Sequence, residues 1–209
     1  EVESSKGFPD PLKAESEVTA ITIIVGKDTF VLGLKPYKSK LPENIGYLMC
    51  KDEKHLLTYF LDLWEHIDLD IVSGWSINGF DIPYMYNRIK NVMGVKEAKR
   101  LSPWHIVDEK ENTWGRGTST RMEYTLRGIQ ILDYFDLYKK LTFTNHESYA
   151  LKHIAHVELG KTKVDWSEFQ SLTELYEKDP AKFYDYNIED ADLVDGLEKK
   201  LGFISQILF

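Results

Sequence analysis

The stretch "SGWSINGFDIPYMYNRIK", residues 73–90, decides the fold that we predict, because it joins a strand to a helix through a turn. The short apolar run before it, residues 69–72, indicates a buried strand. After the Gly-Trp-Ser turn, Asp81 stands directly before Ile82-Pro83, where a helix N-cap is expected. The same aspartate follows the carboxyl end of the strand, where open α/β sheets bind their ligands. Two roles are therefore open for Asp81: a helix cap and a site carboxylate.

Strand and helix patterns alternate along the rest of the chain. The runs on either side of Gly26-Lys27-Asp28 predict a hairpin, and a longer hairpin arm is predicted over residues 104–128, where two glycines interrupt β-leaning flanks. Strands are expected at residues 20–25, 29–33 and 129–132, and helices over residues 52–67, 82–92, after 133, over 149–159 and about 180–209. This alternation predicts an α/β fold with a mixed sheet flanked by helices and a protruding β-hairpin.

Length and composition are typical of a single domain. The 209 residues, 43% of them hydrophobic, are enough for one core, so we predict one domain over residues 1–209. Because no apolar stretch approaches the roughly 20 residues of a membrane helix, the N-terminus is acidic and Cys50 is the only cysteine, we expect a cytoplasmic protein with no membrane partner. The formal charge of −8 counts against electrostatic coating of nucleic acid and fits a site that binds cations.

Carboxylates in the last predicted helix and at the turn are candidates for such a site. Asp190 shares a helix face with Tyr186 and Val194, and burying an ionised carboxylate costs several kcal/mol unless it is paired, hydrogen-bonded or bound to a metal. A buried aspartate that accepts hydrogen bonds from a loop remains an open alternative. If Glu1, Asp81 and Asp190 converge, divalent cations relieve their repulsion, and oxygen ligands favour Mg²⁺ or Mn²⁺. Two such ions about 4 Å apart can activate a water that attacks a phosphodiester, with Tyr186 orienting the water.

Three longer stretches carry a family resemblance. They are "GWSINGFDIPYMYNRIKN" at 74–91, "ILDYFDLYKKLTFTN" at 131–145 and "YNIEDAD" at 186–192. They closely resemble the proofreading exonuclease domain of family B DNA polymerases, of the kind carried by T-even-type bacteriophages, and the resemblance runs essentially from end to end. It implies a ribonuclease H-like fold, removal of mismatched nucleotides from the 3′ end of single-stranded DNA with two metal ions, and the remainder of a polymerase chain as partner.

The resemblance also implies roles for individual residues. By position, the second exonuclease motif falls on Asn78, Phe80 and Asp81, and the third falls on Tyr186 and Asp190. In this family pattern Asp81 and Asp190 are metal ligands, Tyr186 is catalytic, and Asn78 and Phe80 contact DNA.

Three further features resemble parts of the family outside these motifs. Lys161 resembles a catalytic lysine near the carboxylates, and Phe8 resembles an aromatic that wedges against the terminal bases of bound DNA. Residues 112–124 resemble the hairpin that helps to part primer from template. Each has a plain alternative: a surface lysine, a core aromatic and an ordinary loop.

One departure concerns the first exonuclease motif, Asp-x-Glu. Glu1 matches its catalytic, metal-binding glutamate, so the aspartate would stand two residues earlier, outside this sequence, with nearly the whole first strand. We therefore expect an N-terminally truncated fragment of a longer DNA polymerase, whose exposed sheet edge favours pairing with another copy. Because one metal ligand is missing, a non-catalytic DNA-binding module is the alternative function.

Overall fold

The computed structural model describes residues 1–2, 7–38, 40–114, 119–161 and 165–208. The chain forms two compact units. The first comprises Glu1–Phe8, Ser16–Leu56 and Leu137–Phe209, and the second comprises Pro9–Glu15 and Leu57–Asp136. The single domain over residues 1–209 stays a prediction.

The first unit contains a three-stranded mixed sheet in the order β1-β2-β3. β1 (Ala20–Val25) and β2 (Asp28–Gly33) form the predicted antiparallel hairpin, with Val25 opposite Asp28 and Gly26 at a φ of 62° in the connecting turn. β3 (Ile45–Met49) runs parallel to β2, and the sequence analysis did not predict it. Its side chains are half-buried or exposed, so it lacks the continuous apolar run that marks a central strand.

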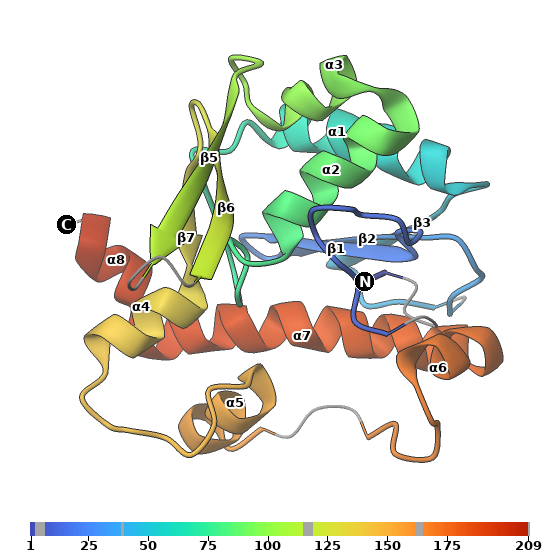
Figure 1. The fold of residues 1–209 in the computed structure, drawn as a ribbon. Coiled ribbons are helices and arrows are strands. Elements are labelled where there is room, and N and C mark those ends of the chain that lie inside the picture. The colour runs from blue at the N-terminus through green and yellow to red at the C-terminus, as the bar shows by residue number, and fades with distance from the viewer. Residues whose placement is uncertain (3–6, 39, 115–118, 162–164, 209) are drawn as a thin grey trace. The chain divides into compact units, whose positions relative to one another are not determined.

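The core of the first unit lies where helices pack on this sheet. α7 (Pro180–Leu201) runs along one face of the sheet, as Figure 1 shows, and α6 (Leu172–Lys178) adds to the same core. The core side chains come from both strands and helices: Ala20, Val31, Leu175, Tyr176, Phe183, Tyr184 and Ile188. Apolar burial from sheet and helices together supplies the main stabilisation of the unit.

Among the helices of the first unit, α6 was not predicted, and one predicted helix needs a correction. α5 (Leu151–Leu159) lies inside the predicted range, whereas the helix predicted over about 180–209 is two helices, α7 and α8 (Phe203–Leu208). They are separated by Gly202 at a φ of 65°, in the left-handed conformation that ends helices. Periodicity alone hid this break, because α8 continues the apolar spacing beyond the glycine.

The second unit is organised around two parallel strands, β4 (Ile71–Gly74) and β7 (Gln130–Asp133). β4 leads through the quoted turn into α2 (Asp81–Met93), followed by the short helices α3 (Val95–Ala98) and η1 (Lys99–Leu101). The strand and α2 were predicted, but β4 is half-buried along its length rather than fully buried. In the described part of the chain it pairs with β7 alone, so an apolar run is not by itself proof of a central strand.

The predicted hairpin arm is present in the second unit. β5 (Val107–Trp114) and β6 (Ser119–Leu126) pair antiparallel along their whole length, and the tip at 115–118 lies outside the described residues. At its base, the Tyr124 ring lies 5.3 Å from the Tyr86 ring of α2, and the Asn87 amide donates a hydrogen bond of 2.9 Å to the Tyr124 hydroxyl. These contacts fix the hairpin on α2.

Two helices remain, α1 (Glu53–Ile67) and α4 (Tyr134–Leu141), and both were predicted from their spacing. Helices and small sheets thus confirm the predicted α/β class, while the ribonuclease H-like arrangement stays a prediction. Among the helices of the described residues, we find none with the length and apolar character needed to cross a bilayer.

Candidate active site

Tyr186 and Asp190 lie one turn apart on α7 and form the centre of the candidate site in the first unit. The Tyr186 side chain is only 9% exposed, and its hydroxyl is hydrogen-bonded to the Asp190 carboxylate. The pKa of Tyr186 lies far above its usual value. Burial is the largest cause, and the negative charges of Asp190 and Glu1 raise the pKa further. Tyr186 is therefore a neutral hydroxyl beside the Asp190 carboxylate and within the electrostatic influence of Glu1.

Glu1 reaches this cluster because its backbone is tied to the start of β1. Its carbonyl oxygen accepts hydrogen bonds from the Thr19 N–H at 3.0 Å and from the Thr19 hydroxyl at 3.3 Å. Val2 forms an antiparallel bridge with Val18. The sequence analysis grouped Glu1 with Asp190, and the electrostatic influence of both on Tyr186 shows that these two residues lie near the same hydroxyl.

Trp166 also belongs to this cluster, and the sequence analysis missed it. Its ring meets the Tyr186 ring edge to face, with 6.3 Å between the ring centres and an interplanar angle of 84°. Trp166 lies far from α7 in sequence and outside any periodic segment, so no sequence pattern pairs these two rings. The contact restricts the orientation of the Tyr186 ring.

Lys161 lies beside α7 but is exposed. Burial raises the pKa of the Asp192 carboxyl, and the positive charge of Lys161 lowers it in part. Asp192 stands two residues after Asp190, and its side chain is exposed, so the burial that acts on its carboxyl is only partial. The lysine thus lies near the middle of α7, and its catalytic role stays a prediction.

The turn of the second unit carries the other motif residues. Asp81 is the first residue of α2 and is exposed, while the N-cap position belongs to Phe80, which makes no side-chain cap hydrogen bond. The cap that the sequence offered as one role for Asp81 is therefore wrong by one position. A carboxylate in the first helical turn is still favoured by the helix dipole.

Asn78 and Phe80 are both held by contacts within the second unit. The Asn78 N–H donates to Asp133 Oδ2 at 3.0 Å, and the Phe80 ring stacks on the Tyr84 ring with centres 5.3 Å apart. Asp133, at the end of β7, was not among the predicted site residues. A signal was available, because an aspartate that ends an apolar strand lies at the sheet edge where ligands bind.

Phe8, in the first unit, is 86% exposed. The alternative of a core aromatic is therefore wrong for this residue. A phenyl ring with this exposure offers a face on which a base can stack.

The carboxylates of the candidate site are possible ligands for a divalent cation. Among the described residues, no three His, Cys, Asp or Glu side chains lie close enough together to hold a metal ion. Glu1 and Asp190, which both act on the Tyr186 hydroxyl, carry the hard oxygen donors that Mg²⁺ and Mn²⁺ prefer. The ligand atoms of this pair are therefore of the type that such an ion binds. Asp81, in the second unit, stays a predicted third ligand.

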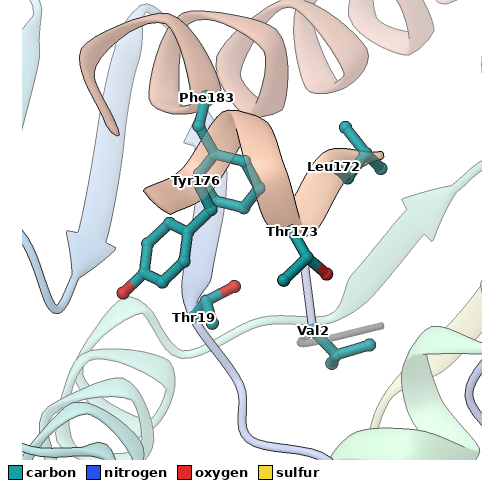
Figure 2. A pocket seen from close by; sticks show the side chains of 6 residues that line it. All are labelled: Val2, Thr19, Leu172, Thr173, Tyr176 and Phe183. Carbon is teal, nitrogen blue, oxygen red and sulfur yellow. The ribbon is translucent and has the colours of Figure 1, made fainter. Parts of the chain in front are cut away.

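Each unit contains a cavity among its described residues. Figure 2 shows the cavity of the first unit, which has a volume of about 10 Å³ and is lined by Val2, Thr19, Leu172, Thr173, Tyr176 and Phe183. That is room for about one water molecule and not for a nucleotide. The cavity of the second unit, about 210 Å³, lies between Trp64, Arg100 and His105. Neither cavity is lined by a predicted site residue.

The class of protein follows from a family comparison. Residues 1–154 match the family described as DNA polymerase family B, exonuclease domain, so the chain belongs to this family. The chain is 37% identical to the DNA-directed DNA polymerase of Escherichia phage RB69 over 98% of its length, and 33% identical to that of Enterobacteria phage T4 over 96%. It is also 27% identical to the DNA polymerase delta catalytic subunit of Plasmodium falciparum over 95% of its length. The chain spans 25% of each phage relative and 19% of the Plasmodium subunit. The predicted family resemblance is thereby confirmed.

Proposed function

We propose that this chain is the 3′–5′ proofreading exonuclease domain of a DNA-directed DNA polymerase and hydrolyses 3′-terminal nucleotides of single-stranded DNA. The observation that carries the proposal is the Tyr186 hydroxyl beside the carboxylates of Asp190 and Glu1, in a chain of the family B exonuclease family. The proposal includes a ribonuclease H-like arrangement of strands and helices. It also includes the remainder of a polymerase as partner, in DNA replication in the cytoplasm of a host cell.

Three carboxylates are proposed to hold two Mg²⁺ or Mn²⁺ ions: those of Glu1, Asp81 and Asp190. When bound, such ions lower the pKa of a water molecule and stabilise the leaving oxygen of a phosphodiester. Where carboxylates lie close together their negative charges repel one another, and a divalent cation would relieve that repulsion.

Tyr186 is proposed to orient the attacking water. A tyrosine with its ordinary pKa is already protonated at neutral pH, and burial and the charge of Asp190 raise the pKa of Tyr186 further, so the phenol stays neutral. Its proton is engaged by Asp190, which leaves the oxygen lone pairs available to accept a hydrogen bond from a water molecule. Trp166 limits rotation of the ring, so that the hydroxyl keeps one direction.

The DNA end is proposed to be held by Phe8, Asn78 and Phe80. Aromatic rings bind unpaired bases by stacking, which tolerates every base and so suits removal of any mismatched nucleotide. Lys161 is proposed to contribute positive charge near the scissile phosphate, and the hairpin of β5 and β6 to help part primer from template.

The decisive experiment measures release of mononucleotides from a labelled single strand in Mn²⁺. It compares this chain with a chain extended upstream to include the aspartate of the Asp-x-Glu motif. In the extended chain, Asp81→Asn should reduce release on the order of 10²-fold or more, because one positioned carboxylate is lost. Asp70→Asn is the matched control, since Asp70 is also exposed and lies just before β4, at the opposite end from the turn.

Two results would contradict the proposal. If the extended chain releases no mononucleotides but still binds the strand, the chain is the non-catalytic DNA-binding module. If Asp81→Asn and Asp70→Asn release nucleotides at the same rate, Asp81 has no part in the chemistry.

A further inference from the structure

Asp133 is buried to 5% exposure at the end of β7, and the mechanism proposed above does not use it. β7 is parallel to β4, and Asp133 pairs in register with Gly74, the last residue of β4. The carboxylate therefore stands at the point where the chain leaves β4 and enters the turn that carries Asn78 and Asp81.

Both oxygens of this carboxylate bind backbone N–H groups. Oδ1 accepts from Ser76 at 3.0 Å and from Phe135 at 3.1 Å, and Oδ2 accepts from Asn78 at 3.0 Å. Two of these donors belong to the turn, and the third belongs to the first turn of α4. One side chain thus ties the turn after β4 to the start of the helix after β7.

The turn requires such an anchor because its backbone is unusual. Ser76 has a φ of 62°, in the left-handed region that costs a non-glycine residue free energy. The turn closes on itself through N–H groups of Gly79 and Phe80, which donate to the Ser76 carbonyl at 2.8 and 3.0 Å. A change in the backbone of Ser76 would therefore also move Phe80, and with it Asp81, the next residue.

We propose that Asp133 is a positioning residue for the site, holding the turn so that Asn78 and Asp81 are presented in one fixed arrangement. This inference rests on the proposed function, because Asp81 is taken there as a metal ligand. Burial raises the pKa of the Asp133 carboxyl, and the hydrogen bonds from the turn oppose that rise, as expected for a carboxylate that serves as an acceptor.

The test uses Asp133→Asn in the full chain. Asparagine keeps one carbonyl oxygen for Ser76 and Phe135, but its NH₂ group would face the Asn78 N–H, donor against donor. We expect Mn²⁺ binding, measured by water-proton relaxation without DNA, to weaken about tenfold or more, as when outer partners of metal ligands are removed. Asp136→Asn is the matched control, because Asp136 lies one turn away and accepts none of these three hydrogen bonds.

A second measurement needs neither metal nor DNA. Hydrogen exchange of the unmodified chain should show the Ser76 and Asn78 amides protected, and in Asp133→Asn the Asn78 amide should lose protection first. The inference is overturned if these two amides exchange freely in the unmodified chain. It is also overturned if Asp133→Asn and Asp136→Asn bind Mn²⁺ equally while Asp81→Asn abolishes binding. If Asp81→Asn has no effect on Mn²⁺ binding or on nucleotide release, the proposed function fails instead, and amide exchange still tests the anchoring by Asp133.

Discussion

Tyr186 combines burial with a hydroxyl on which the charges of Asp190 and Glu1 act, and this combination determines the expected effect of its substitution. Tyr186→Phe keeps the ring and its contact with Trp166 but removes the oxygen. We expect nucleotide release by the upstream-extended chain to fall on the order of 10²-fold, because a positioned group is lost from the reaction. Mn²⁺ affinity should change little, because the carboxylates remain.

The control for this substitution is Tyr59→Phe, which removes an exposed hydroxyl from α1. Single-turnover rates and Mn²⁺ titrations of the two variants separate rate from metal binding. Equal losses of rate and of Mn²⁺ affinity in Tyr186→Phe would refute the water-orienting role.

Among single residues, the predicted candidates and the observed contacts agree in part. Glu1, Asp81 and Asp190 were predicted to converge, with Tyr186 beside them; Tyr186 and Asp190 lie one helical turn apart and the charge of Glu1 acts on Tyr186, while the convergence with Asp81 stays a prediction. Asp133 and Trp166 were missed, because each acts on a residue far away in sequence. The turn donates to the Asp133 carboxylate through backbone N–H groups, which nearly every residue type has. The sequence of the turn therefore does not reveal this contact.

At the scale of elements, β2 and α7 approach each other closely at Gly33 in the first unit. A Cβ added to Gly33 would lie 2.5 Å from the Tyr184 hydroxyl oxygen and 2.6 Å from the ring. That ring is 0% exposed and is enclosed by Tyr37 and Tyr47, and its hydroxyl accepts a hydrogen bond of 2.9 Å from the Lys35 N–H. Tyr184 therefore has no room to move.

This close approach predicts that Gly33→Ala lowers the free energy of unfolding by about 1–3 kcal/mol, the usual range for overpacking a core. Gly46→Ala is the matched control on β3, because its Cβ would meet only the Thr29 carbonyl oxygen at 4.0 Å. Urea unfolding of both variants measures the difference. Equal stability of Gly33→Ala and Gly46→Ala would show that the Tyr184 side chain can shift to make room for the added methyl group.

The elements themselves were mostly predictable, and the exceptions share a cause. The hairpin of β1 and β2 and the helices α1, α2 and α7 have local signals in turn residues and apolar spacing. β3 and α6 have weak local patterns and become ordered by packing on β2 and α7. Propensity is a weak guide where tertiary contacts decide.

At the scale of the whole molecule, the net charge of −8 opposes binding to a polyanion. We expect affinity for a single-stranded oligonucleotide to be higher in Mn²⁺ than in EDTA at equal ionic strength, because cations at the carboxylates remove the repulsion between protein and phosphate. The salt dependence should be shallow, since each phosphate neutralised on a single strand contributes only about −0.7 to the slope of log affinity against log salt.

Fluorescence anisotropy with a cleavage-resistant phosphorothioate 3′ end measures both quantities. Equal affinity in Mn²⁺ and EDTA would contradict the expectation. A steep salt slope would instead indicate an extended basic surface. Self-association through a sheet edge stays a prediction, which sedimentation of the chain at several concentrations can test.

The sequence by itself determined the α/β class, the long helix that carries Tyr186 and Asp190, the turn that carries Asn78 and Asp81, and the family. These are local properties, since a turn, a helix period or a motif is complete within a few neighbouring residues. Only the tertiary structure decided that the charges of Glu1 and Asp190 both act on the Tyr186 hydroxyl, that Trp166 packs on its ring and that the Asp133 carboxylate accepts hydrogen bonds from the turn. Such contacts join residues distant in sequence, and they form because buried polar groups must find partners wherever the fold brings them.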